Sequence, residues 1–218
     1  MALVQIVALA AALAVAGMAA PAAAAPAERP VKIVALGDSL TSGYGLPAGS
    51  AFPAKLQKAL QIKGHAVEIA NAGVSGDTAT GGLARLDWSV PDGTDAVIVE
   101  LGANDMLRGT DPKVTRKAIE EIVRRLTERR IVVLLAGMRA PPNLGGAYVR
   151  DYEAIFSDIA KKYDVLFYPF FLEGIAAEGK FNQRDGLHPT ARGIDQIVTG
   201  ILPAAEELIA RVRAKRTM

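Results

Sequence analysis

The sequence has no cysteine among its 218 residues and only two histidines. The absence of cysteine excludes disulfides, a thiol nucleophile, thiolate metal sites and a lipidated cysteine anchor. It neither supports nor excludes an oxidising compartment. The two histidines, His65 and His188, lie far apart in the chain, which makes them a poor ligand set. We therefore expect no bound metal.

Neither sign of charge is in excess. Lys and Arg number 25, Asp and Glu number 23, and the formal net charge is +2. Nucleic-acid binding usually needs a concentrated basic face, so this composition does not support it. The basic end RVRAKR (211–216) is typical of a solvated helix terminus. A chain that is half hydrophobic and of this length suits one compact domain.

The first charged side chain is Glu28, after a long apolar, alanine-rich stretch. This pattern is typical of a signal peptide, although the amino-terminal region lacks the usual Lys or Arg. We predict a leader over residues 1–27, cleaved after Ala24 or Ala27, and one folded domain over 28–218, located in the periplasm or secreted. A retained membrane anchor is the alternative. The alanine content and the prolines at 21 and 26 weaken it.

Five short runs predict strands, at 31–36, 66–73, 96–101, 131–137 and 164–170, and the β-branched run at 31–36 predicts a buried one. Apolar residues at helical spacing predict helices at 51–64, 81–90, 111–130, 148–163 and 188–216, the last bent or broken near Pro203. Alternating strands and helices predict a five-stranded parallel sheet with helices on both faces. In such α/β sheets, ligands bind outside the carboxyl ends of the strands.

Polar, glycine-rich segments follow the strands at that edge: GDSLTSG, NAGVSGDT, LGANDM and, later, DGLHP. A serine becomes nucleophilic when a base takes its proton, and histidine is the usual base. Ser39 lies in the first segment and His188 in the last, and Asp185 can hold the imidazole ring. His65 is expected at the opposite edge, as a surface residue.

An acyl-transfer site also needs donors for the oxyanion of its tetrahedral intermediate. The backbone N–H groups of Ser39 and Gly76 and the side-chain amide of Asn104 are candidates. Each segment alone is more often a turn or a helix cap, but their occurrence together at one edge favours a site. Asp38 and Asp105 fit a bracing role for these loops better than a catalytic one.

Apolar residues beside the predicted site are candidate substrate contacts: Leu40, Met106, Met138 and Leu144. The last two belong to segment 138–148, which follows the fourth strand. Its prolines and glycines fit a hinged flap over an acyl chain. The alternative is a loop whose apolar residues only cover the edge of the sheet.

The four segments together resemble the SGNH hydrolases, also called GDSL esterases or lipases. The matching blocks are GDSL (37–40), Gly76 within SGDT, GAND (102–105) and DGLHP (185–189). Within that family, the chain is most similar to the exported bacterial thioesterase, lysophospholipase and arylesterase group. The resemblance implies a flavodoxin-like three-layer α/β/α sandwich, a serine esterase without a cofactor, and broad acyl-ester and thioester substrates.

The resemblance also implies the site residues. It carries over Ser39 as nucleophile, Gly76 and Asn104 as oxyanion donors, and Asp185 with His188 as acid and base. We expect a monomer that acts on small acyl esters or thioesters, possesses no membrane span after leader cleavage and binds no nucleic acid.

Two other functions stay open. A carbohydrate O-deacetylase can use the same fold and triad, and a shallow polar groove would favour it. A non-catalytic binding module, such as a flavin binder, is the third alternative. Asp38 in the first loop would repel a flavin phosphate, and no member of the triad is missing.

Overall fold

The computed structural model describes residues 29–217, so the predicted leader lies outside the described residues. Its five parallel strands form one sheet in the order β2-β1-β3-β4-β5. The strands are β1 (Val31–Gly37), β2 (Val67–Gly73), β3 (Ala96–Glu100), β4 (Val132–Ala136) and β5 (Leu166–Tyr168). This is the flavodoxin-like order of a doubly wound sheet, and it confirms the predicted fold class.

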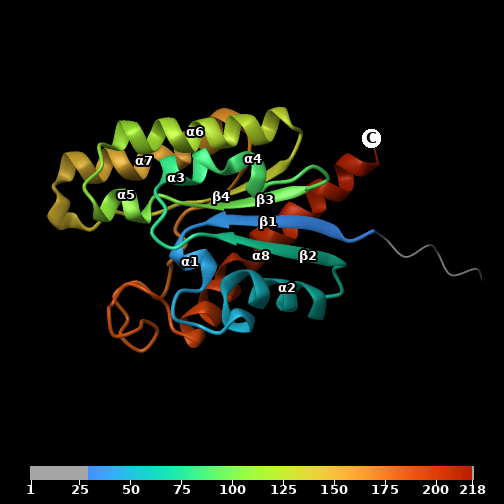
Figure 1. Cartoon of the computed structure of the whole chain (residues 1–218), viewed down its shortest axis with the longest axis horizontal. Coiled ribbons are helices and arrows are strands. Elements are labelled where there is room, and N and C mark those ends of the chain that lie inside the picture. The colour runs from blue at the N-terminus through green and yellow to red at the C-terminus, as the bar shows by residue number, and fades with distance from the viewer. Residues whose placement is uncertain (1–28, 218) are drawn as a thin grey trace, which may run out of the picture.

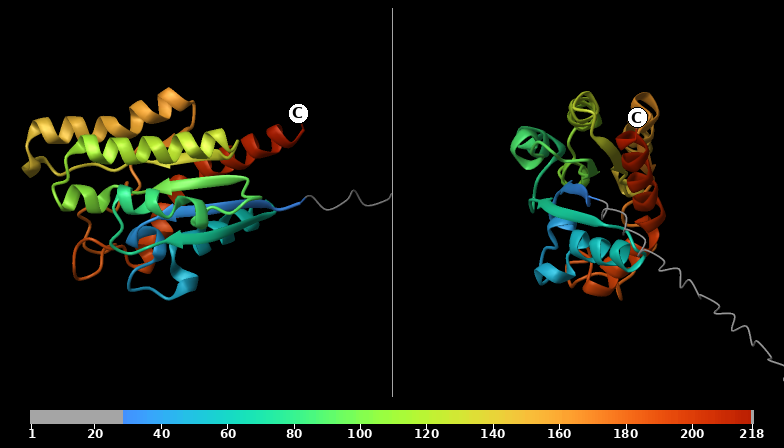
Figure 2. Two further views of the ribbon diagram at one scale, coloured as in Figure 1. Left: turned by 45° about the horizontal axis from the view of Figure 1, so that its top comes forward. Right: turned by 90° about the vertical axis from the view of Figure 1, so that its right-hand side faces the viewer.

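Helices cover both faces of the sheet and complete three layers (Figures 1 and 2). One face carries α3 (Ala79–Ala84), α4 (Leu86–Ser89), α6 (Pro112–Glu128) and α7 (Gly146–Tyr163). The other carries α2 (Phe52–Ile62) and α8 (Ala191–Arg216). Every residue of β3 is buried, as expected for a central strand covered on both faces. Within residues 29–217 no helix is long and apolar enough to span a membrane.

The strand register brings three loops to one edge. Gly37 at the end of β1 is level with Gly73 of β2 and Glu100 of β3. A Cβ atom on Gly37 would lie 2.1 Å from Thr41 Oγ1, so only glycine lets the chain turn this tightly after the strand. The short helices α1 (Ser39–Ser42) and α5 (Ala103–Leu107) lie at this edge, on the left of Figure 1.

The structure corrects several details of the predicted elements. Helices α1 and α5 and the 3-10 turns η1 (Ala48–Ser50) and η2 (Pro142–Leu144) were not predicted. The expected helix at 81–90 divides into α3 and α4 at Arg85. Of the two alternatives predicted at Pro203, a break is wrong, because α8 runs continuously past this residue, and a bend stays a prediction. Proline removes one N–H from the helix, and the buried face of α8 offsets that loss.

Candidate active site

Ser39, His188 and Asp185 form a hydrogen-bonded chain at the carboxyl edge of the sheet. Ser39 Oγ lies 2.9 Å from His188 Nε2, and His188 Nδ1 lies 2.7 Å from Asp185 Oδ2. Ser39 belongs to α1, whereas Asp185 and His188 belong to the loop before α8. Ser39 and His188 are 149 positions apart in the sequence. The structure thus brings together the three residues that the sequence predicted for the triad. His65 instead lies before β2, with its Nε2 3.2 Å from Glu206 of α8.

Asp185 stabilises the conformation of the loop that carries both itself and His188. Its Oδ1 accepts the backbone N–H groups of Leu187 and His188, at 2.9 and 3.0 Å. The bond from the His188 backbone is the largest of the effects that lower the Asp185 pKa to about 2. Asp185 is therefore ionised at neutral pH. Because its other oxygen faces Nδ1, the carboxylate can hold the ring with Nε2 toward Ser39.

Tyr44 and Gln183 join the nucleophile segment to the histidine loop, and neither was predicted. The Tyr44 ring centroid lies 4.5 Å from that of His188, and the Tyr44 carbonyl accepts a 2.8 Å bond from Gln183 Nε2. Gln183 also donates its backbone N–H to the His188 carbonyl at 2.7 Å. No pattern in the sequence marked these long-range contacts.

Asp38 braces the turn that carries the nucleophile. The side chain is fully buried, and its Oδ1 caps α1 by accepting the N–H of Leu40 at 2.9 Å. Its Oδ2 accepts the Asn104 amide at 3.0 Å. Burial raises the Asp38 pKa to about 6, although these two hydrogen bonds oppose the rise. Bracing of the loop agrees with the role that the sequence favoured.

Three potential oxyanion donors lie on the loops at this edge. Within residues 29–217, no hydrogen bond engages the backbone N–H of Ser39 or of Gly76. Gly76 has a φ of +86°, a left-handed conformation that favours glycine. Asn104 Nδ2 donates to the Asp77 carbonyl at 3.0 Å as well as to Asp38. Both amide hydrogens of Asn104 thus have acceptors within the protein.

Two further carboxyl groups are buried below these loops. Asp105 accepts the N–H of Ala79 at 2.8 Å and the hydroxyl of Thr115 at 3.0 Å, and so ties α5 to α3 and α6. Glu100 accepts the Thr41 hydroxyl at 2.7 Å, while its Oε1 has no partner among the described residues. Burial, and next the charge of Asp38, raise the Glu100 pKa well above its ordinary value. Glu100 was not predicted as a site residue, although a carboxyl group ending an otherwise apolar strand is a recognisable signal.

The four predicted substrate contacts have different surroundings. Leu40 and Met138 belong to the hydrophobic core and are 5% and 3% exposed, which leaves little surface for a substrate. Met106 is partly buried on α5, and Leu144 is 37% exposed at the end of η2. Their contact with a substrate stays a prediction. Three other apolar side chains on the loops and short helices of this edge are exposed: Tyr44, Leu107 and Leu187.

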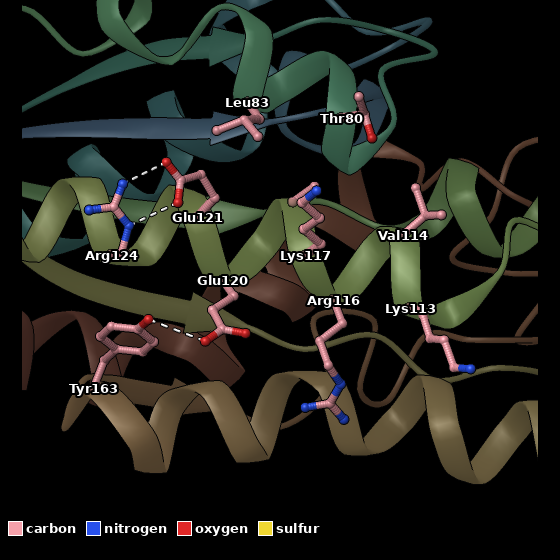
Figure 3. A pocket seen from close by; sticks show the side chains of 11 residues that line it. Thr80, Leu83, Lys113, Val114, Arg116, Lys117, Glu120, Glu121, Arg124 and Tyr163 are labelled. Carbon is pink, nitrogen blue, oxygen red and sulfur yellow. Dashed lines mark hydrogen bonds and ion pairs between the residues drawn. The ribbon is translucent and has the colours of Figure 1, made fainter.

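A hollow of about 570 Å³ lies elsewhere, over α6 between α3 and the end of α7 (Figure 3). Thr80, Leu83, Val114 and Tyr163 are among its lining residues, together with charged side chains of α6. It includes no predicted site residue. The described residues also contain no group of three His, Cys, Asp or Glu side chains that could hold a metal ion.

The chain is similar to several known proteins. Residues 35–195 match the model of the GDSL-like Lipase/Acylhydrolase family. An arylesterase of Vibrio mimicus is 38% identical over 159 residues, which are 72% of this chain and 80% of that protein. The thioesterase 1/protease 1/lysophospholipase L1 of Escherichia coli K12 is 38% identical over 158 residues, which are 72% of this chain and 74% of that protein.

A solved structure gives the same result. The crystal structure of AlinE4, an SGNH-hydrolase family esterase, has a TM-score of 0.70 to this chain at 45% identity. The match covers 83% of this chain and 97% of AlinE4.

Proposed function

The chain belongs to the GDSL-like lipase/acylhydrolase family and is a serine esterase, and on this premise we propose that Ser39, His188 and Asp185 are its catalytic triad. The observation that carries the proposal is the short contact of His188 Nε2 with Ser39 Oγ, with Asp185 on the other ring nitrogen. A nucleophile, a base and an orienting acid in this order are the parts that acyl transfer needs.

The first half of the reaction forms an acyl-enzyme. His188 Nε2 takes the hydroxyl proton as Ser39 Oγ attacks the carbonyl carbon of an ester or thioester. The oxyanion that forms is stabilised by the N–H groups of Ser39 and Gly76 and by the Asn104 amide. His188 then gives its proton to the departing alcohol or thiol, and the acyl group stays on Ser39. Water activated by His188 attacks the acyl-enzyme in the second half and releases the acid.

Exposed apolar side chains support acyl substrates. Tyr44 packs on His188, Leu187 precedes it, and Leu107 lies on the helix that holds Asn104. The named activities of the relatives also include thioester and lysophospholipid cleavage. We therefore propose aryl and acyl esters and acyl thioesters as the substrate class. No observation favours a carbohydrate ester.

We extend the proposal to the whole chain. Residues 1–27 are a leader for export to the periplasm or beyond, and residues 28–218 are one hydrolase domain that acts as a monomer on small-molecule substrates. The apolar, uncharged composition of residues 1–27 supports the leader, and the family match over residues 35–195 supports the single domain. Sequencing the amino terminus of the exported protein tests it, with Ala25 or Glu28 expected as the first residue.

The test of the triad is covalent labelling. A fluorophosphonate should modify Ser39 and stop esterase activity, and Ser39→Ala should abolish both labelling and turnover. His188→Ala should be comparably damaging. The matched control is His65→Ala, which should keep near wild-type activity because His65 lies at the other edge of the sheet. Full activity in Ser39→Ala, or an essential His65, would refute the proposed triad.

A further inference from the structure

Arg85 is a buried cation next to the proposed site, and the reaction scheme above gives it no role. It lies between α3 and α4 and is only 7% exposed. A buried arginine is rare unless its donors are satisfied. Arg85 donates four hydrogen bonds, and three of them leave its own helical segment.

These bonds join the two loops that carry Ser39 and Gly76. Arg85 Nη2 donates to the Gly37 carbonyl at 2.8 Å, two residues before the nucleophile. Nη1 donates to the Ala72 carbonyl near the end of β2 at 2.8 Å, and to Ser89 Oγ at 3.0 Å. Nε donates to Asp77 Oδ2 at 2.6 Å, directly after Gly76. One rigid guanidinium thus fixes both loops relative to each other.

The contact of Arg85 with Asp77 also affects Asn104, the third potential oxyanion donor. The Asp77 backbone carbonyl accepts the Asn104 amide at 3.0 Å, while the Asp77 carboxylate is held by Arg85. The position of residue 77 therefore affects both the Gly76 peptide and the orientation of Asn104. A lysine at position 85 would have a single ammonium group in place of the planar guanidinium, so it could not donate to Asp77, Ala72 and Gly37 at the same time.

We propose that Arg85 is a positioning residue that aligns Gly76 and Asn104 with Ser39 for oxyanion stabilisation. This inference rests on the proposed function, since it assumes that these groups face the oxyanion. A displacement of about 1 Å in a catalytic group can cost roughly 100-fold in rate. We expect Arg85→Lys to lower kcat by about 10- to 100-fold with little change in KM. Asp77→Asn should lower kcat in the same way, by a smaller factor.

A matched control separates positioning from general stability. Arg129 is also partly buried and donates to a backbone carbonyl, that of Val90, at 2.6 Å. It lies just before β4, at the amino edge of the sheet, so Arg129→Lys should leave kcat unchanged. Melting temperatures of all variants show how much folded protein each measurement contains.

Two readouts distinguish positioning from a merely structural role. Arg85 lines a hollow of about 390 Å³ beside Trp88, so added guanidinium has a route into the space left by Arg85→Ala. Guanidinium, well below unfolding concentrations, should restore part of the kcat of Arg85→Ala and leave Arg85→Lys unchanged. In an Asn104→Ala background, Arg85→Lys should cost less than in the wild type, because both changes act on one group of donors.

The outcomes are distinguishable. Wild-type kcat in Arg85→Lys, or fully additive losses with Asn104→Ala, would overturn the proposal. So would a folded Arg85→Ala that guanidinium does not rescue; if that variant does not fold, Arg85→Lys and Asp77→Asn decide. Failure of the proposed function itself appears elsewhere, as a wild type without esterase activity or as an active Ser39→Ala.

Discussion

Asn104 donates both of its amide hydrogens to the protein, one to the Asp38 carboxylate and one to the Asp77 carbonyl. If Asn104 also donates to the oxyanion, one of its amide hydrogens must leave its present acceptor, or be shared between that acceptor and the oxyanion, in the transition state. A hydrogen bond that strengthens only in the transition state raises kcat, whereas a hydrogen bond that is equally strong in the substrate complex mainly lowers KM. The resting hydrogen bonds keep the amide near its place in the absence of substrate.

The corresponding prediction is that Asn104→Ala lowers kcat by about 10²- to 10³-fold, with a smaller effect on KM. Steady-state kinetics on an aryl ester measures both constants. A change confined to KM would mean that Asn104 binds the substrate and does not stabilise the oxyanion.

Glu100 gives a residue-scale prediction on stability. Its buried carboxyl has a pKa well above the ordinary value, because burial disfavours the charged form and Asp38 lies close by. Above the ordinary carboxyl pKa, the unfolded chain has lost this proton while the folded chain keeps it. The free energy of unfolding contributed by Glu100 therefore falls as pH rises.

Glu100→Gln should remove that dependence and still accept the Thr41 hydroxyl. Near pH 4, the melting temperature of the variant should be equal to or lower than that of the wild type. As the pH rises toward 8, the variant should become the more stable protein, by a difference that grows with pH. Glu68→Gln, on an exposed position of β2, is the control for replacing a glutamate of the sheet by glutamine. An unchanged difference across this pH range would mean that Glu100 is ionised in the folded protein.

Among the elements, the five strands could be predicted from sequence because most of them are apolar runs, and the run of β3 is completely buried. Helices α1 and α5 could not. They have four and five residues, too short for an apolar periodicity, and depend on tertiary contacts. The Thr41 hydroxyl of α1 donates to Glu100, 59 positions away, and Asp105 of α5 accepts bonds from Ala79 and Thr115, 26 and 10 positions away.

The residues of the candidate site also fall into two groups, those that could be predicted from the sequence and those that could not. Ser39, Asp185 and His188 lie in segments with a recognisable local sequence, so they could be predicted. Arg85 and Tyr44 could not, because their roles depend on partners that only the fold brings near.

The element η2 gives a prediction on substrate choice. Leu144 ends η2 at the carboxyl edge, between β4 and α7, and is 37% exposed. If it packs on an acyl chain, each methylene buried there contributes at most about 0.8 kcal/mol. Leu144→Ala should then flatten the rise of kcat/KM with chain length, measured on p-nitrophenyl esters from acetate to laurate.

The exposed polar neighbour Asn143 supplies the matched control, since Asn143→Ala should preserve the dependence on chain length. A uniform loss at every chain length in Leu144→Ala would assign the loop a structural role instead.

At the scale of the whole molecule, the two ends of the described chain meet far from the site. Asp95 accepts hydrogen bonds from Arg29 and Arg216, each at 2.7 Å, and from the backbone N–H of Lys32 at 2.8 Å. Asp95 directly precedes β3, so this cluster lies at the amino edge of the sheet, whereas α1, which holds Ser39, lies at the carboxyl edge (Figure 1). We therefore expect changes in this cluster to leave the chemistry undisturbed.

Asp95→Asn tests that separation. Burial alone would raise the Asp95 pKa, but the hydrogen bonds from Lys32 and Arg216 outweigh it and lower the pKa. The stabilisation is therefore present above the ordinary carboxyl pKa and is lost as pH falls through the lowered one. Asp95→Asn should lower the melting temperature at pH 7, by less near pH 3, and leave kcat/KM of the folded protein unchanged. Asp92→Asn, which removes only a fully exposed partner of Arg129, should change neither quantity appreciably. A loss of kcat/KM in Asp95→Asn at unchanged melting temperature would mean that the two edges of the sheet are coupled.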